Sequence, residues 1–180
     1  MKMVVGLGNP EPEYSNTRHN VGKDVLNSYV GESLEWKQDK NFGVFLAKDS
    51  ECIYVKPLSY MNESGPSISK IFNFYKINCE DLLVIYDELD IFIGECKLAR
   101  AKGSRIHKGI LSLNESLGFS TFWHLRMGVR DLDIPSSVQK SGADPAKYVL
   151  RKLLVSDRKK IQNLIQTFVS PAIKEWLSKK

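Results

Sequence analysis

The chain has 180 residues, of which 42% are hydrophobic and 26% charged, a composition that suits one globular domain with a sizeable core over residues 1–180. Its apolar runs are all shorter than a membrane span, and Met1 to Met3 lead straight into the first predicted strand without a signal sequence. Three widely spaced cysteines without a metal-ligand spacing favour reduced thiols, so we expect a cytoplasmic protein without membrane contact, metal or cofactor.

The net charge of +5 is unevenly distributed along the chain. Residues 151–180 carry eight Lys or Arg against two acids, a net +6, and residues 97–108 carry five against none. The rest of the chain therefore sums to −6. Because Lys and Arg displace counterions from phosphates, two basic segments on an acidic body favour a nucleic-acid partner. Two separate solvated faces are the alternative, since the sequence leaves open whether both segments lie on one side.

Apolar periodicity predicts strands and helices that alternate along the chain. Segments 2–7 and 82–86 predict buried strands, 43–48 and 52–56 predict a hairpin, and 122–129 predicts a further strand. Helical spacing is found in 21–29, 62–75, 109–117, 144–153 with Asp144-Pro145 at its start, and the C-terminal segment. The apolar stripe of that last segment contains Ile161, Leu164, Ile165, Phe168, Ile173 and Trp176. We therefore expect a single α/β domain with a mixed, mostly parallel sheet and helices on both faces.

Polar side chains with chemical function follow the predicted strands, at the sheet edge where α/β proteins bind ligands. Asn9 stands in the Gly-Asn-Pro turn after the first strand, His19 follows ten residues later, and Asp87 comes directly after residue 86. An imidazole titrates near neutral pH, and a carboxylate can fix its tautomer. These residues predict a catalytic site. The structural alternative is that Asn9 caps a turn, His19 begins a helix and one acid of the Asp-Glu-Leu-Asp motif caps a loop.

A second polar motif leads from a strand into a helix over residues 56–65, with the sequence KPLSYMNESG. Asn62 or a neighbour is the helix cap by default, but an amide at a helix start can also hold a substrate carbonyl or phosphate. A dinucleotide site at the first turn is disfavoured, because Glu11 stands where the third glycine of that fingerprint belongs.

Four motifs in this order and spacing resemble the bacterial-type peptidyl-tRNA hydrolase family: Val-Gly-Leu-Gly-Asn-Pro, Thr-Arg-His-Asn, Pro-x-x-Tyr-Met-Asn-x-Ser-Gly and Asp-Glu-Leu-Asp. The likeness covers residues 2–130, and the C-terminal helices agree in kind. It implies a monomeric α/β enzyme that acts on the acceptor end of peptidyl-tRNA. The implied reaction is hydrolysis of the ester between a stalled peptide and the 3′ end of the tRNA.

By position, the resemblance implies that His19 is the general base and that Asp87 keeps it basic. Asn9 matches the residue that distinguishes blocked from free aminoacyl groups. The positions that contact the tRNA end or the peptide match Tyr14, Tyr60 and Asn62.

The segment after Lys102-Gly103-Ser104 departs from the family, which usually carries Gly-Gly-His-Asn-Gly there. Here the double glycine is lost, the segment is one residue shorter, and Lys108 stands in place of the asparagine. An ammonium donates hydrogen bonds but cannot accept them as an amide does. We hypothesise that Lys108 and Arg105, in the basic run with Lys102, attract tRNA phosphates. Drift in a tolerant loop is the alternative.

Two other functions stay open at this point. The chain could be a relative that binds RNA in RNA processing without hydrolysing it, or a different small hydrolase on the same fold. An imidazole together with its orienting acid favours an enzyme over a binding module. Segment 131–143 contains Pro, Ser and Gly and is expected to form a mobile loop, which is a candidate lid.

Overall fold

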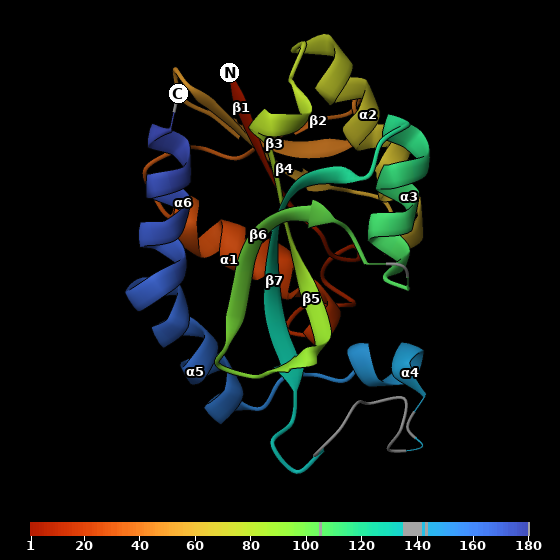
Figure 1. Cartoon of the computed structure of the whole chain (residues 1–180), viewed down its shortest axis with the longest axis vertical. Coiled ribbons are helices and arrows are strands. Elements are labelled where there is room, and N and C mark those ends of the chain that lie inside the picture. The colour runs from red at the N-terminus through yellow and green to blue at the C-terminus, as the bar shows by residue number, and fades with distance from the viewer. Residues whose placement is uncertain (105, 135–141, 143, 180) are drawn as a thin grey trace.

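The apolar runs of the sequence form the centre of one seven-stranded sheet with the order β2-β3-β4-β1-β5-β7-β6 (Figure 1). The computed structural model describes residues 1–104, 106–134, 142 and 144–179. Parallel pairing joins the four central strands, whereas both ends of the sheet are antiparallel. The strands are β1 (Lys2–Gly6), β2 (Lys37–Asp39), β3 (Val44–Lys48), β4 (Cys52–Pro57), β5 (Leu82–Phe92), β6 (Cys96–Lys102) and β7 (Thr121–Arg130).

Helices cover both faces of this sheet, as the sequence predicts. Along β1, Val4 belongs to one apolar cluster and Met3 and Val5 to the other, because successive side chains of a strand point to opposite faces. The cluster of Val4 packs under α1 (Val21–Val30), α5 (Val155–Leu164) and α6 (Ser170–Ser178). The other cluster packs under α2 (Ser64–Phe74) and α3 (Lys108–Leu117). The expected mixed α/β fold is confirmed.

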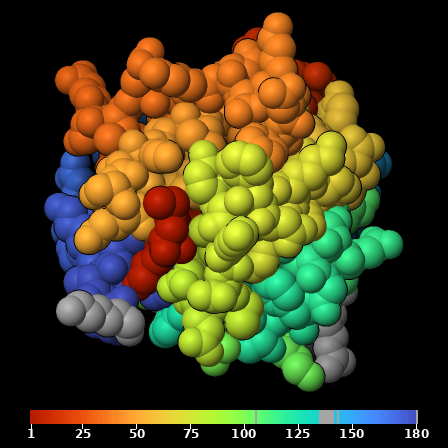
Figure 2. Space-filling model, turned by 90° about the horizontal axis from the view of Figure 1, so that it is seen from above, coloured from red at the N-terminus to blue at the C-terminus, as the bar shows by residue number. Residues whose placement is uncertain are grey.

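The chain start lies at the end of the molecule shown in Figure 2, where the first residues, in red, lie between the C-terminal helix and the segment leading to β5. There Lys2 Nζ donates to the carbonyl oxygens of Trp176 and Lys179, at 2.5 and 2.6 Å. These carbonyls end α6, and a cation is favourable at a helix C-terminus. These contacts hold the start of β1 to the end of α6, and the carboxyl ends of β1 and β5 point the other way.

Two sequence predictions about the C-terminal third are wrong in detail. The helix predicted for 144–153 is α4 (Pro145–Val149), because the chain beyond it pairs with the first loop: Leu153 N–H donates to Asn16 O at 2.8 Å. Phe168, predicted on the apolar stripe, is 50% exposed. It lies in the π-helical stretch η4 (Ile165–Val169), whose wider turn rotates it away from the sheet.

Other differences extend what the sequence pattern predicts. The edge strand β6 is not among the predicted strands, and β5 continues to Phe92 instead of ending at residue 86. The first turn of the helix predicted for 62–75 is a 3-10 turn, η2 (Met61–Glu63). Most of the loop predicted over 131–143 lies outside the described residues. Among the helices that are described, none has the length and apolarity needed to cross a bilayer.

Helices α2 and α3 approach each other closely at Gly65, and this contact yields a test of the packing. A Cβ added at Gly65 would overlap the carbonyl oxygen of Ser112 and the hydroxyl of Ser116. Gly65→Ala should therefore lower the free energy of unfolding by about 1–3 kcal/mol, although alanine is the better helix former. The exposed change Lys70→Ala on the same helix should have little effect. Urea denaturation measures both, and an unchanged or more stable Gly65→Ala would contradict this packing.

Candidate active site

Segments far apart in the sequence bring polar side chains together at the carboxyl ends of β1 and β5. Asn9 follows β1, His19 lies in the single 3-10 turn η1 (Arg18–Asn20) before α1, and Asp87 lies within β5. These residues have exposed fractions of only 6%, 9% and 2%, and they line one pocket. The structure thus brings together the three residues that the sequence predicts to act in catalysis.

The carboxylate of Asp87 contacts two imidazoles through a single oxygen. His19 Nδ1 lies 2.7 Å from Asp87 Oδ1, and His107 Nε2 lies 2.9 Å from the same atom. An ionised carboxylate can only accept hydrogen bonds, so both of these ring nitrogens carry a proton. In its neutral form His19 is therefore the Nδ1–H tautomer, and its Nε2 is left to accept a proton.

His107 is held at both of its ring nitrogens. Its Nδ1 accepts the backbone N–H of Ile110 at 3.3 Å and so caps the N-terminus of α3. Helix caps are usually Ser, Thr, Asp or Asn, and our sequence reasoning did not single out His107. The signal for His107 in the sequence is that one of only three histidines lies two residues before the helix predicted for 109–117.

The ionisation of Asp87 follows from its two imidazole neighbours. Burial by itself raises the pKa of Asp87, because a low-dielectric environment disfavours the charged carboxylate. The charges and hydrogen bonds of His19 and His107 outweigh burial and hold that pKa well below its ordinary value. Asp87 is therefore an anion at neutral pH, and it can stabilise an imidazolium formed at His19.

The turn at Asn9 is fixed by hydrogen bonds to its backbone and to its amide. The side chain of Asn20 accepts from Asn9 N–H at 2.8 Å and donates to Asn9 O at 3.1 Å, and Lys23 Nζ donates to the same carbonyl at 2.8 Å. Asn9 Oδ1 accepts the backbone N–H of Met61 at 2.8 Å. Because that oxygen is engaged, Nδ2 is the atom of the Asn9 amide that is left to donate to a ligand.

Asn9, His19, Asp87 and His107 line a pocket of about 450 Å³. The rings of Tyr14 and Tyr60 meet edge to face on its wall, with centroids 6.1 Å apart. Asn62 and Lys108 also line the pocket and are exposed to solvent. The aliphatic part of the lining comes from Leu89, Ile106, Pro145, Ala146, Val149 and Leu150.

Two of the predicted substrate contacts, Lys102 and Arg105, remain predictions. Lys102 ends β6 opposite Thr121, six residues before Met127, the β7 partner of Asp87. Lys102 is not among the residues that line the pocket. Arg105 lies outside the described residues.

Of the described residues, His19, Asp87 and His107 form the group of potential metal ligands whose donor atoms are closest, all within 4.8 Å of one another. The two ring nitrogens that face Asp87 are both at hydrogen-bond distance from its Oδ1. A metal ion bound by these atoms would have to replace both ring protons, since a ligating imidazole nitrogen carries none. The geometry therefore fits a hydrogen-bonded triad, which needs no ion.

The fold and the site together define a class: an α/β enzyme that presents a carboxylate-oriented imidazole to a substrate in a pocket. Comparison with known proteins specifies the family. The sequence model described as "Peptidyl-tRNA hydrolase" matches residues 3–180. A relative with that name from Bacillus cereus (strain Q1) is 39% identical over 184 residues, covering 99% of this chain and 94% of the relative.

Two further relatives agree. The protein named peptidyl-tRNA hydrolase from Chlorobaculum tepidum is 39% identical over 168 residues, which cover 92% of this chain and 86% of that protein. The crystal structure of peptidyl-tRNA hydrolase from Acinetobacter baumannii superposes with a TM-score of 0.79 at 25% identity, covering 98% of this chain and 92% of that one. This chain belongs to the peptidyl-tRNA hydrolase family.

The buried Lys23 beneath the Asn9 turn predicts a pH dependence of stability. Burial, reinforced by Lys56, lowers the pKa of Lys23 to about 8, and Glu11 opposes this only in part. Between that value and its ordinary pKa of about 10.4 the unfolded chain binds more protons, so this residue makes stability rise with pH.

We expect the stability of the wild type, relative to Lys23→Met, to rise by ~2 kcal/mol between pH 8 and pH 10. Denaturation of both proteins at each pH measures this, and the other titrating groups cancel in the difference. A flat or falling difference would mean that the fold does not lower the pKa of Lys23.

Proposed function

We propose that this protein hydrolyses the ester that joins a peptide, or an N-blocked aminoacyl group, to the 3′ end of tRNA, and releases both products. The observation that carries the proposal is the hydrogen bond of His19 Nδ1 to the buried Asp87, which leaves His19 Nε2 to act in the pocket. Membership of the peptidyl-tRNA hydrolase family names the substrate.

In the reaction His19 is the general base. Nε2 takes a proton from a water molecule as the water oxygen attacks the ester carbonyl carbon, and the resulting imidazolium is stabilised by the anionic Asp87. When the tetrahedral intermediate collapses, the bond to the ribose 3′ oxygen breaks and His19 returns the proton to that oxygen. The tRNA leaves with a free hydroxyl, and the peptide leaves as a carboxylic acid that loses its proton to solvent and becomes a carboxylate.

The remaining polar groups of the pocket hold the substrate. Asn9 Nδ2, left free by the contact of Oδ1 with Met61, donates to a carbonyl or to the developing oxyanion, and so distinguishes blocked from free aminoacyl groups. Asn62 supplies a second amide at the start of α2. The ring faces of Tyr14 and Tyr60 contact the terminal nucleotide or the peptide.

The tRNA body contacts the two basic segments of the sequence. The turn before β6 packs on α5, since a Cβ added at Gly94 would lie 3.8 Å from Lys160 Cβ. The basic residues of β6 and those described in the C-terminal helices are exposed. We place the protein in the cytoplasm as a monomer that works without metal or cofactor. RNA binding without hydrolysis, the alternative function, is not favoured by the family or by the site.

The decisive assay compares N-acetyl-aminoacyl-tRNA with unblocked aminoacyl-tRNA. The wild type should cleave the blocked ester rapidly and the free one slowly. His19→Ala should lower kcat by ~100-fold or more, because the general base is lost. Asp87→Asn should lower kcat by ~100-fold or more, because the imidazole loses its anionic partner.

The matched control is Asp90→Asn, an exposed acid of the same strand that does not line the pocket. It should retain wild-type turnover. Binding of tRNA by the wild type without any cleavage would refute the proposed function and support the RNA-binding alternative.

Lys108 provides a separate test of how the tRNA is held. It is the first residue of α3, where the helix dipole disfavours a cation and favours an anionic ligand. If Lys108 contacts a tRNA phosphate, Lys108→Asn should reduce the slope of log affinity against log salt by about one. Lys70→Asn, on the exposed side of α2, should leave the slope unchanged. Equal slopes for the wild type and Lys108→Asn would show that Lys108 makes no phosphate contact.

A further inference from the structure

We propose that Arg18 is a positioning residue, which ties the turn that carries His19 to the end of β7 and to α4. Helix α4 forms part of the pocket wall, so this tie sets the distance between the general base and the substrate. The inference rests on the proposed function, and it gives a role to a buried cation that touches neither the pocket nor the triad.

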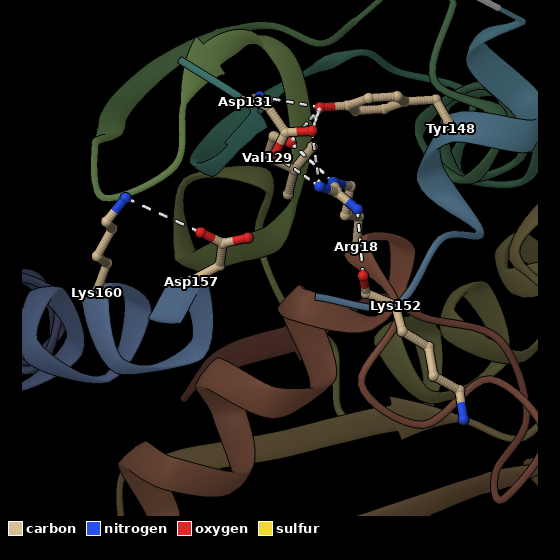
Figure 3. Close-up of polar contacts among 7 residues, drawn as sticks. All are labelled: Arg18, Val129, Asp131, Tyr148, Lys152, Asp157 and Lys160. Atoms are coloured by element: carbon tan, nitrogen blue, oxygen red, sulfur yellow. Dashed lines mark hydrogen bonds and ion pairs between the residues drawn. The ribbon is translucent and has the colours of Figure 1, made fainter. Parts of the chain in front are cut away.

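The guanidinium of Arg18 uses its donors on three separate partners (Figure 3). Both oxygens of Asp131 accept from Nη2, at 2.6 and 2.9 Å, while Nε donates to Val129 O at 3.2 Å and Nη1 to Lys152 O at 3.3 Å. Arg18 is only 4% exposed. A planar guanidinium can make these contacts at once, whereas an ammonium cannot reach all of them.

Tyr148 connects this cation to α4. Its ring lies under the Arg18 guanidinium, 4.7 Å from centroid to Cζ, and its hydroxyl lies 2.8 Å from Asp131 Oδ2 and 2.9 Å from the Asp131 backbone nitrogen. The residues directly after it, Val149 and Leu150, line the pocket. The position of this wall is therefore set by the same aspartate that binds Arg18. Asp157 and Lys160, in the same view, form a separate ion pair at 3.9 Å.

Backbone contacts also connect the residues beside His19 to the chain that follows α4. Arg18 N–H donates to Arg151 O at 3.1 Å, and Thr17 pairs with Lys152 in an antiparallel bridge. His19 is the next residue after Arg18, in a turn of only three residues, so a shift of the arginine moves the imidazole. A displacement of about 1 Å at a catalytic group can cost ~100-fold in rate.

The contacts of the His19 turn and those of α4 can be tested separately by steady-state kinetics on N-acetyl-aminoacyl-tRNA. Arg18→Lys keeps the charge but loses the planar guanidinium that reaches three partners at once. It should therefore lower kcat about 10-fold or more, with KM changed by less than about 3-fold. Tyr148→Phe keeps the ring against Arg18 and removes the hydroxyl that holds α4 to Val129 and Asp131. It should raise KM at least about 3-fold, with kcat within about 2-fold of wild type.

Arg130→Lys is the matched control. Arg130 is also a buried arginine at the end of β7, where it donates to the carbonyl oxygen of Asp90, and the His19 turn is not among its partners. Arg130→Lys removes a buried guanidinium outside the His19 turn, so kcat and KM should be unchanged. Equal kcat losses in both arginine variants, or a Tyr148→Phe enzyme with wild-type KM, would overturn the proposal.

Hydrogen exchange of the backbone N–H groups at residues 17–20 gives a readout that does not depend on turnover. Exchange should accelerate in Arg18→Lys and not in Arg130→Lys. If the wild type does not cleave the substrate, the proposed function fails, and exchange alone then decides whether Arg18 holds the turn. If Arg18→Lys does not fold, Asp131→Asn takes its place, with the same kcat loss expected.

Discussion

The structure depends on one buried carboxylate, Asp87, whose Oδ1 accepts hydrogen bonds from two imidazoles. An ion so fully buried is tolerated only when its neighbours compensate for the lost hydration. The Nδ1 of His107 also caps α3, and the Nε2 of His19 is the atom that we propose as the general base. The same interaction therefore joins β5, η1 and the start of α3, and orients the proposed general base.

The surrounding fold keeps this triad in place from several directions. The parallel centre of the sheet brings the Asn9 turn beside the end of β5, and Lys23 and Asn20 hold that turn from below. The antiparallel edge strand β6 returns the chain to α3 and so delivers His107. On the opposite side, Arg18 joins η1 to β7 and α4. Rigid elements rather than loops supply most of these supports, which suits a site that must hold a water molecule in line with an ester.

The sequence predicts the proposed catalytic residues because each stands next to a recognisable element. Asn9 and Asp87 come after apolar strand runs, and His19 comes before a helical pattern. It does not reveal the supports, because these are long-range contacts. In the sequence, the basic residues of β6 predict only a charged segment. In the structure they form the exposed side of an edge strand. Helix α4 ends early because residues 151–153 pair with residues 16–18, which no local pattern can show. His107 escapes notice because histidine is an unusual helix cap.

The most direct test is to assign the ring tautomers by ¹⁵N NMR of the three histidines at pH 8, where neutral imidazoles dominate in reference peptides. Shared hydrogen bonding to Asp87 predicts the Nδ1–H form for His19 and the Nε2–H form for His107. In Asp87→Asn the His19 preference should be lost. Finding His19 as the Nε2–H tautomer in the wild type would contradict the account, because that ring could not accept the proton of water at the substrate side.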